Sequence, residues 1–227
     1  MTSAPADPAR RPWPRRAIAG GILLVLGGLL GWWIFLQLGQ PFAIDRWWNR
    51  LLPDDPTEPA LIFGLVMNRV GGTWLGVFAI PVAVALALVL LRRPWAAAYF
   101  VVASALSALV VQLIKNLVDR ARPEDIVVAT DAGSYPSGHT ANAATIATVA
   151  AIVLPRVWIV IAGAVWTLLM ALSRTVLHAH WVSDTVGGTL LGIGMGLIVA
   201  AVLTEQLERE RTARAGARRA APRSPRR

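Results

Sequence analysis

A histidine and an aspartate near the end of the chain have the spacing of a nucleophile and its partner. His180 and Asp184 are four residues apart, in a segment where a helix is expected to begin near residue 180. Residues i and i+4 lie on one helix face, so the Asp184 carboxylate could accept the Nδ1–H of His180 and leave Nε2 as a neutral nucleophile. His178 lies off that face. Such a pair is also common as a purely structural contact, so it indicates a reactive site only together with other groups.

A second polar cluster, Pro136 to His139 (PSGH), precedes an Ala/Thr-rich helix. At a helix start, Ser137 and Gly138 would present a hydroxyl, free backbone N–H groups and the positive end of the macrodipole, which together favour an anion. Ser137 could equally be an ordinary N-cap. His139 adds an imidazole one residue further on, within reach of an ester oxygen of a phosphate bound there.

A third cluster supplies cations. Lys115 is the only lysine among 22 basic side chains, and Arg122 follows it in KNLVDRARP. An ammonium and a planar guanidinium differ in geometry, and phosphate sites often combine the two. Pro123 fixes the exit of the chain from the preceding helix. Snorkelling to the membrane surface is the alternative for Lys115, and we interpret Arg120 as a loop charge.

Membrane-length apolar segments separate these clusters. The chain of 227 residues is 56% hydrophobic and 15% charged, with a mean hydropathy of +0.55, which is too apolar for an ordinary soluble domain. Segments of membrane-spanning length, about 17 to 25 residues, cover residues 17–38, 73–91, 95–114 and 185–203. Two shorter apolar segments cover residues 140–154 and 157–172. The sequence therefore predicts an all-α polytopic membrane bundle of six transmembrane helices.

The distribution of arginine predicts the orientation of this bundle. Basic residues precede the first span and recur at Arg92-Arg93, at Arg156 and from Arg209 to Arg227. With six spans these segments share one side, which the positive-inside rule makes cytoplasmic. Both termini are then cytoplasmic in a multi-pass protein of the cell membrane, and the three polar clusters face the exterior or periplasm. The first apolar segment exceeds the roughly 7 to 15 residues of a signal peptide, so we expect an uncleaved helix.

The predicted organisation has three parts. Residues 1–16 are a cytoplasmic basic lead, residues 17–204 the membrane domain, and residues 205–227 a cytoplasmic Arg-rich tail that is partly disordered, after residue 213. The net charge of +9 is explained by topology and anionic lipid, so no nucleic-acid partner is expected.

The external connection 39–72 is the longest loop, and it carries two notable features. Trp47 and Trp48 are interpreted as aromatic anchors at the membrane boundary. The apolar stretch from Ala60 to Met67 is a candidate amphipathic helix along the interface, and guidance of a lipid into the site is the alternative role of this segment.

Cofactor chemistry finds no support in the composition. There is no cysteine, hence no disulfide framework, haem attachment or thiolate metal site. No obvious carboxylate cluster for Mg²⁺ occurs, so we expect neither a cofactor nor a metal. No internal repeat is visible, which disfavours a transporter built from duplicated halves.

Taken in order, K-x6-RP, PSGH and SR-x5-H-x3-D resemble the motifs of the type 2 phosphatidic acid phosphatase (PAP2) family, which shares its site with vanadium haloperoxidases. Ala121 stands where a proline often precedes the final Arg-Pro, and we expect no catalytic effect from it. The motifs cover residues 115–184, and the six-helix arrangement extends the resemblance to residues 17–204. Every motif position is filled: Lys115, Arg122, Pro123, Pro136, Ser137, Gly138, His139, Ser173, Arg174, His180 and Asp184.

The resemblance implies a mechanism without metal. His180 would attack phosphorus and form a phosphohistidine, Asp184 would orient its ring, and His139 would protonate the leaving alkoxide. Cations and helix-start donors would hold the equatorial phosphate oxygens. These groups are Lys115, Arg122, Ser137, Gly138 and Arg174.

The predicted function is that of an integral-membrane lipid phosphate phosphatase, with the lipid bilayer and a membrane lipid phosphate as its partners. Candidate substrates are polyprenyl diphosphates, our first choice, phosphatidic acid and phosphatidylglycerol phosphate. The alternative is a non-catalytic anionic-lipid binder or transporter that uses the same cations. Haloperoxidase chemistry is disfavoured by six spans and the lack of a long soluble body.

Overall fold

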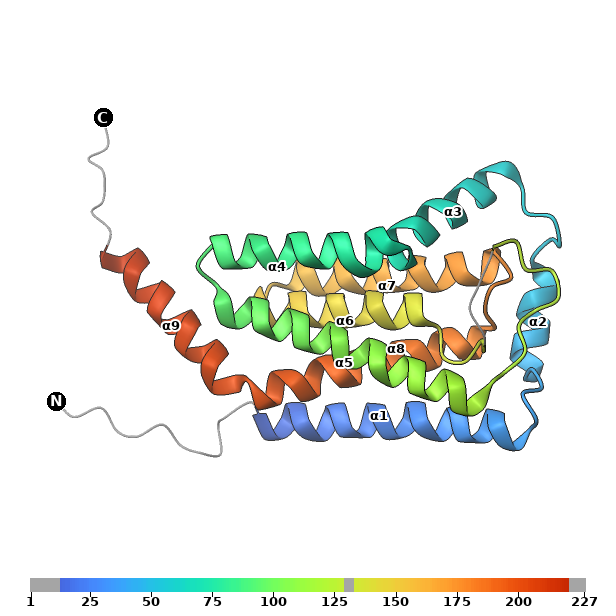
Figure 1. The fold of residues 1–227 in the computed structure, drawn as a ribbon, viewed down its shortest axis with the longest axis horizontal. Coiled ribbons are helices and arrows are strands. Elements are labelled where there is room, and N and C mark those ends of the chain that lie inside the picture. The colour runs from blue at the N-terminus through green and yellow to red at the C-terminus, as the bar shows by residue number, and fades with distance from the viewer. Residues whose placement is uncertain (1–12, 129–132, 221–227) are drawn as a thin grey trace.

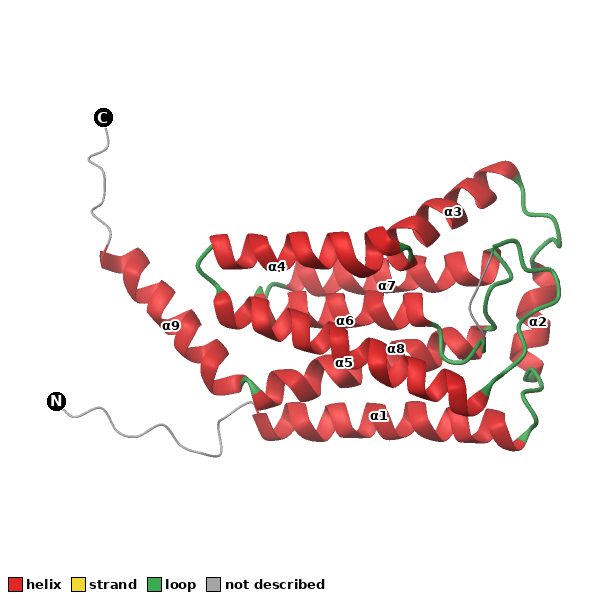
Figure 2. Cartoon of the chain, viewed as in Figure 1, coloured by secondary structure: helices red, strands yellow, loops and turns green. Residues whose placement is uncertain are grey.

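The computed structural model describes residues 13–128 and 133–220, and within these ranges all regular structure is helical (Figure 2). The all-α prediction is confirmed. The helices and the π-helical turn η2 follow one another along the chain. They are α1 (Trp13–Leu36), α2 (Ala43–Leu51), α3 (Glu58–Gly72), η2 (Leu75–Ala79), α4 (Ile80–Leu90), α5 (Pro94–Val118), α6 (Gly138–Val153), α7 (Val157–Val176), α8 (Val182–Val202) and α9 (Thr204–Ala220).

Helix α8 packs against α1, α5 and α6 inside the bundle (Figure 1). Its small residues make this close packing possible, because glycines let helix backbones approach one another. A Cβ at Gly192 would lie 2.3 Å from the Ala141 carbonyl oxygen, and one at Gly188 would lie 2.5 Å from the Ser137 oxygen. Outward faces of other helices carry exposed apolar side chains, among them Leu29, Val82 and Leu168, which suits contact with lipid.

In the described part of the chain, four helices are long and apolar enough to cross a membrane: α1, α5, α7 and α8. A fifth span is possible if α3 and the η2–α4 segment, which bend by 46° at their break, count as one. The predicted span 73–91 is thus the second half of a bent helix pair. Helix α6 has 16 residues, just under the usual spanning length of about 17 residues or more. Six spans are therefore not confirmed by length and composition.

The stretch from Ala60 to Met67 is helical, but it does not form a separate element. It belongs to α3, which continues to Gly72, leads into η2 and packs on α7. Trp47 and Trp48 lie on α2, which stands across the end of the bundle in Figure 1.

The two ends of the bundle differ in character, as the charge pattern predicts. The start of α1, the α4–α5 turn, the α6–α7 turn and α9 gather at one end, and α2 with the loop before α6 lies at the other (Figure 1). At the first end, Arg93 connects α6 and α9, since it donates to the Val153 carbonyl at 3.1 Å and pairs with Glu210 at 3.4 Å. The polar clusters of the sequence all belong to the second end.

The tail is more ordered than its composition suggests. Helix α9 extends to Ala220, past residue 213, and residues 221–227 lie outside the described part of the chain. Alanine and arginine are strong helix formers. Arg209 also pairs with Glu205 one turn earlier at 3.6 Å, which supports an exposed helix by a few tenths of a kcal/mol, about 0.3 to 0.5.

Candidate active site

A cavity of about 990 Å³ collects most of the predicted site residues. Its other walls come from η2, α4 and α5 and are mainly apolar. Two predicted residues, Ser137 and Asp184, are fully buried rather than in the cavity wall, and the Ser137 N–H donates to the Asp184 carbonyl at 3.0 Å. The predicted residues that line the cavity are Lys115, Arg122, Gly138, His139, Arg174 and His180.

His180 lies in the short loop between α7 and α8, with its ring almost completely buried. Its Nδ1 is 3.6 Å from Asp184 Oδ2, slightly beyond hydrogen-bonding length, and its Nε2 is 3.3 Å from Nη1 of Arg122. A guanidinium only donates, so Nε2 must carry the lone pair and Nδ1 the hydrogen. This is the tautomer that a nucleophilic Nε2 requires.

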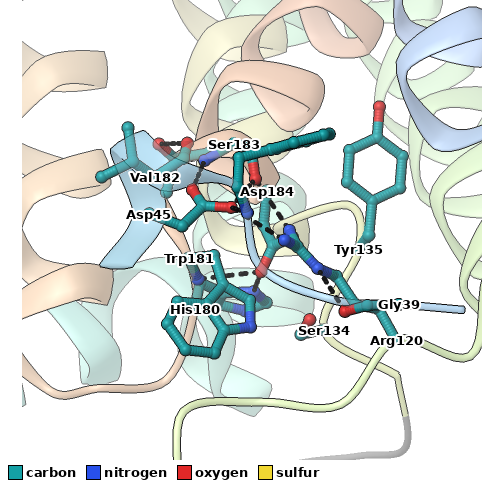
Figure 3. A network of polar contacts seen from close by, with 12 residues as sticks. Gly39, Asp45, Arg120, Ser134, Tyr135, His180, Trp181, Val182, Ser183 and Asp184 are labelled. Carbon is teal, nitrogen blue, oxygen red and sulfur yellow. Dashed lines mark hydrogen bonds and ion pairs between the residues drawn. The ribbon is translucent and has the colours of Figure 1, made fainter. Parts of the chain in front are cut away.

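The start of α8 differs from the prediction in detail. The helix begins at Val182 rather than near residue 180, and Trp181 is its N-cap. The i, i+4 pair is nevertheless formed, because Asp184 Oδ2 accepts the Trp181 N–H at 2.9 Å and so draws the loop toward the carboxylate (Figure 3). Asp184 thereby fixes both the helix start and the position of His180.

Burial lowers the pKa of His180 from 6.5 to about 4, with opposing contributions from its charged neighbours. Asp184 raises this pKa, whereas the positive charges of Arg122 and Arg174 lower it. The imidazole is therefore neutral at physiological pH, as a nucleophile must be.

His139 is the second residue of α6 and faces the end of α3. Its Nε2 lies 3.4 Å from the Asn68 carbonyl oxygen. Gly71 and Gly72 leave room for the ring, since a Cβ at Gly72 would lie 1.9 Å from the same nitrogen. The bent helix pair thus forms one wall of the site around His139.

Two of the cations converge on one loop carbonyl. Lys115 Nζ donates to the Gly133 oxygen at 3.2 Å, and Arg122 Nη2 donates to it at 2.9 Å. Arg122 Nη1 also donates to the Ala179 carbonyl at 2.6 Å, beside His180. These contacts hold an ammonium and a guanidinium together at the cavity wall, where a phosphate could bind both.

Arg174, from the last turn of α7, is buried and lines the same cavity. Its Nη1 donates to Asn68 Oδ1 at 2.8 Å, while its Nε has no hydrogen-bond partner among the described residues. A buried donor without a partner is rare in proteins. Arg174 thus adds a third cation to the cavity wall.

Ser137 caps α6: its Oγ accepts the Thr140 N–H at 3.5 Å and lies 3.0 Å from Thr140 Oγ1. This is the N-cap role, and phosphate binding by the hydroxyl stays a prediction. Tyr135 fixes the preceding loop, because its hydroxyl donates to the Gly27 carbonyl at 2.6 Å. A Cβ at Gly187 would lie 2.3 Å from the Tyr135 ring, so that glycine makes room for it.

His178 is outside this group, as its position off the Asp184 face predicts. It does not line the cavity, and its ring nitrogens lie 3.0 Å from Asn49 Oδ1 and 3.1 Å from the Pro53 carbonyl oxygen. The side chain therefore joins the His180 loop to α2 and to the segment that follows it.

Arg120 lies in the loop after α5, as predicted, but it is not an exposed charge. Arg120 is fully buried, with Nη2 2.8 Å from Asp45 Oδ2 and Nη1 2.5 Å from Asp184 Oδ1 (Figure 3). Asp45, within the external connection 39–72, is buried on α2. Nothing in the sequence indicated that Asn68 contacts both Arg174 and His139. No local spacing could have shown these contacts, because Asp45 and Arg120 are 75 residues apart.

Within residues 13–128 and 133–220, no cluster of three or more His, Asp or Glu side chains is arranged to hold a metal ion. The charged and imidazole side chains that line the cavity are Lys115, Arg122, Arg174, His139 and His180, which suit an anionic ligand.

Comparisons with known proteins agree with this chemistry. The family model described as "PAP2 superfamily" matches residues 96–208. A decaprenylphosphoryl-5-phosphoribose phosphatase from Mycobacterium tuberculosis is 35% identical over 158 residues, which cover 66% of this chain and 84% of that protein. Phosphatidylglycerophosphatase B from Bacillus subtilis is 28% identical over 119 residues, or 48% of this chain and 58% of the relative.

A similar fold occurs among solved structures. The transmembrane PAP2-type phosphatidylglycerolphosphate phosphatase from Bacillus subtilis superposes with a TM-score of 0.70 at 19% identity, covering 82% of this chain and 96% of that one.

Proposed function

Because the chain belongs to the PAP2 superfamily, we propose that it removes a phosphate from a membrane lipid through a covalent phosphohistidine at His180. The chain is a multi-pass membrane protein, and its named relatives are phosphatases. The substrate, the covalent intermediate and the role of each residue are our inference from the site.

One observation carries the proposal: a neutral, buried imidazole shares a cavity with another imidazole and three cations brought from separate elements. His180 and His139 are the imidazoles, and Lys115, Arg122 and Arg174 are the cations. A cavity that only had to bind an anion would need the cations and not a nitrogen lone pair kept unprotonated by burial. Acid–base and nucleophilic catalysis require that lone pair.

The first chemical step transfers the phosphoryl group to His180. A phosphate oxygen would take over the Arg122 donor that is 3.3 Å from Nε2 in this structure, which frees the Nε2 lone pair. Nε2 then bonds to phosphorus as the bond to the leaving oxygen breaks, and His139 donates a proton to that oxygen. Asp184 stabilises the positive ring that forms, as an oriented carboxylate does for a catalytic histidine.

The second step releases phosphate. Water attacks phosphorus, His139 accepts a proton from it, and the bond to Nε2 breaks to restore neutral His180. Lys115, Arg122, Arg174 and the Gly138 N–H would balance the charge on the equatorial oxygens in both steps. The Ser137 hydroxyl would join them only by turning from Thr140.

The apolar part of the cavity supports a lipid substrate. Beyond the polar residues, its lining continues along Val77, Phe78 and Val82, and then along Leu86 and Val101. An acyl or prenyl chain could lie there while its phosphate reaches His180. Pockets of about 300 to 1,000 Å³ are typical for ligands of moderate size.

Among lipids, a polyprenyl-linked phosphate is our first candidate. The mycobacterial relative, of which this chain covers 84%, is named for decaprenylphosphoryl-5-phosphoribose. Polyprenyl diphosphates, phosphatidic acid and phosphatidylglycerol phosphate are the other candidates.

We further propose six membrane crossings, with the bent pair α3–α4 as one and α6 as a short one. Basic residues at one end of the bundle support cytoplasmic termini. The cavity residues near His180 would then face the exterior or periplasm. The site would lie at the headgroup level of the outer leaflet.

The proposal is tested by phosphate release from purified protein with these four substrate classes, in the presence of EDTA. His180→Ala should abolish release, whereas the matched variant His178→Ala should retain it, because His178 does not line the cavity. If His180→Ala binds lipid phosphates and no variant or wild-type protein releases phosphate, the chain is a binder or transporter instead.

A further inference from the structure

Three buried charged side chains next to His180 are connected by two ion pairs. Arg120 is between the carboxylates of Asp45 and Asp184, and all three side chains have zero exposure (Figure 3). None of the three lines the cavity. The mechanism above uses Asp184 and gives no role to the other two.

The geometry points to Asp45 as a positioning residue for catalysis, which acts through Arg120 on Asp184 and so on the His180 imidazole. This inference rests on the proposed role of His180 as the nucleophile. It adds an electrostatic role for α2, an element that lies outside all three sequence motifs.

Asp45 contributes a negative charge to the buried cluster behind His180. Arg120 is 2.5 Å from one Asp184 oxygen, so by itself it would neutralise the carboxylate that faces His180. Asp45, at 2.8 Å from the same guanidinium, supplies a second negative charge. The set of Asp45, Arg120 and Asp184 then keeps one net negative charge beside His180. That charge is needed when phosphoryl transfer makes the imidazole ring positive.

Asp45 also accepts several hydrogen bonds from groups on either side of it. Its Oδ1 accepts the Ser183 N–H at 2.9 Å, and its Oδ2 accepts the Ser183 hydroxyl at 2.7 Å and the Phe42 N–H at 3.0 Å. Asp45 therefore fixes the start of α2 to the first turn of α8, one residue before Asp184. A residue with only a surface role would not use both oxygens in this way.

The other end of α2 holds the same loop. Asn49 is 3.0 Å from His178, two residues before His180, while Asp45 holds Ser183, three residues after it. Helix α2 thus contacts the chain on both sides of His180. Asn49 is uncharged, whereas Asp45 is negatively charged and is linked through Arg120 to Asp184.

The remaining charged and titratable groups around His180 are the site cations and His139. Arg122 and Arg174 lower its pKa and Asp184 raises it, and Lys115 and His139 line the same cavity. All of these except Asp184 also contact substrate in the proposed mechanism. Asp45 and Arg120 are therefore the positions where the charge behind His180 can be changed without removing a phosphate contact.

The test compares Asp45→Asn, Arg120→Gln and the double variant with wild type, using Asp54→Asn as control. Asp54 is an exposed acid in the same external connection. Asp45→Asn should lower kcat by about tenfold to a hundredfold, the scale for residues that orient a reactive group. Its KM should stay near wild type, because Asp45 does not line the cavity.

Charge compensation separates this role from a merely structural one. Asp45→Asn leaves Arg120 free to neutralise Asp184, so the pKa of His180 falls and the acid limb of kcat/KM moves to lower pH. Arg120→Gln should move that limb to higher pH, and the double variant should recover part of the kcat lost in Asp45→Asn. Simple loosening would let water in and move the limb upward, toward 6.5, in both single variants.

The inference is overturned if Asp45→Asn keeps wild-type kcat, if the double variant is no better than Asp45→Asn, or if both single variants shift the acid limb upward. Should Asp45→Asn not fold, Asp45→Glu and the comparison of Arg120→Gln with the double variant decide the question, since Glu retains the charge. His180→Ala is included throughout. Its continued activity would reject the proposed function, whereas an inactive His180→Ala beside a fully active Asp45→Asn rejects the role of Asp45 alone.

Discussion

Replacing Gly72 by alanine should remove His139 from its catalytic position. The added Cβ would lie 1.9 Å from His139 Nε2, whereas ordinary contact begins at 3.4 Å, so the ring or the end of α3 must shift by about 1.5 Å. A displacement of about 1 Å at a reacting group can cost on the order of a hundredfold in rate. We therefore expect kcat with a lipid phosphate to fall by about a hundredfold.

The assay compares a lipid phosphate with p-nitrophenyl phosphate. A general acid matters most for a poor leaving group such as an alkoxide, so the loss should be much smaller with p-nitrophenyl phosphate. Gly28→Ala in α1 is the matched control, since a Cβ there meets nothing within 4 Å. If Gly72→Ala behaves like Gly28→Ala, or if both substrates lose activity equally, the reasoning about His139 is refuted.

Three further predictions follow from the same site. Asp184→Asn should lower kcat by up to about 10⁴-fold, the scale for losing the carboxylate partner of a catalytic histidine; a tenfold loss or less in steady-state turnover would contradict its role. His178→Ala should lower the unfolding midpoint, through its lost contacts to Asn49 and Pro53, with a much smaller effect on kcat than Asp184→Asn; an equal loss of kcat would mean that His178 belongs to the reactive group. Because burial lowers the pKa of His180 from 6.5 to about 4, the folded protein binds fewer protons there than the unfolded chain, so this contribution to stability should fall as pH decreases from 6.5 to 4. In thermal unfolding, His180→Ala should reduce that acid sensitivity, and an unchanged pH dependence would contradict the buried neutral imidazole.

Much of the membrane architecture could be predicted because apolar length and charge placement are local properties of the chain. The segments 95–114 and 185–203 correspond to α5 and α8, and the basic turns lie together at one end. The bend between α3 and α4 could not be read in this way. It depends on the π-helical turn at Leu75–Ala79 and on packing of α3 against α7.

The site was predictable to the extent that its residues lie in compact motifs. His139, His180, Lys115, Arg122 and Arg174 meet at one cavity, as their sequence clusters suggest.

Contacts between distant, unpatterned residues could not be predicted. Asp45 and Arg120 pair only because α2 folds across the end of the bundle (Figure 1). Ser137 had two possible roles in the sequence, and its contact with Thr140 gives it the N-cap role. Composition also did not show that α9 would continue to Ala220.

The most direct test of the central claim is to trap the phosphoenzyme. Purified protein mixed with a ³²P-labelled lipid phosphate and quenched in base within one turnover should carry acid-labile label on His180. The label should be absent from His180→Ala and present in His178→Ala. Label that survives acid, or label that persists in His180→Ala, would contradict a phosphohistidine at this residue.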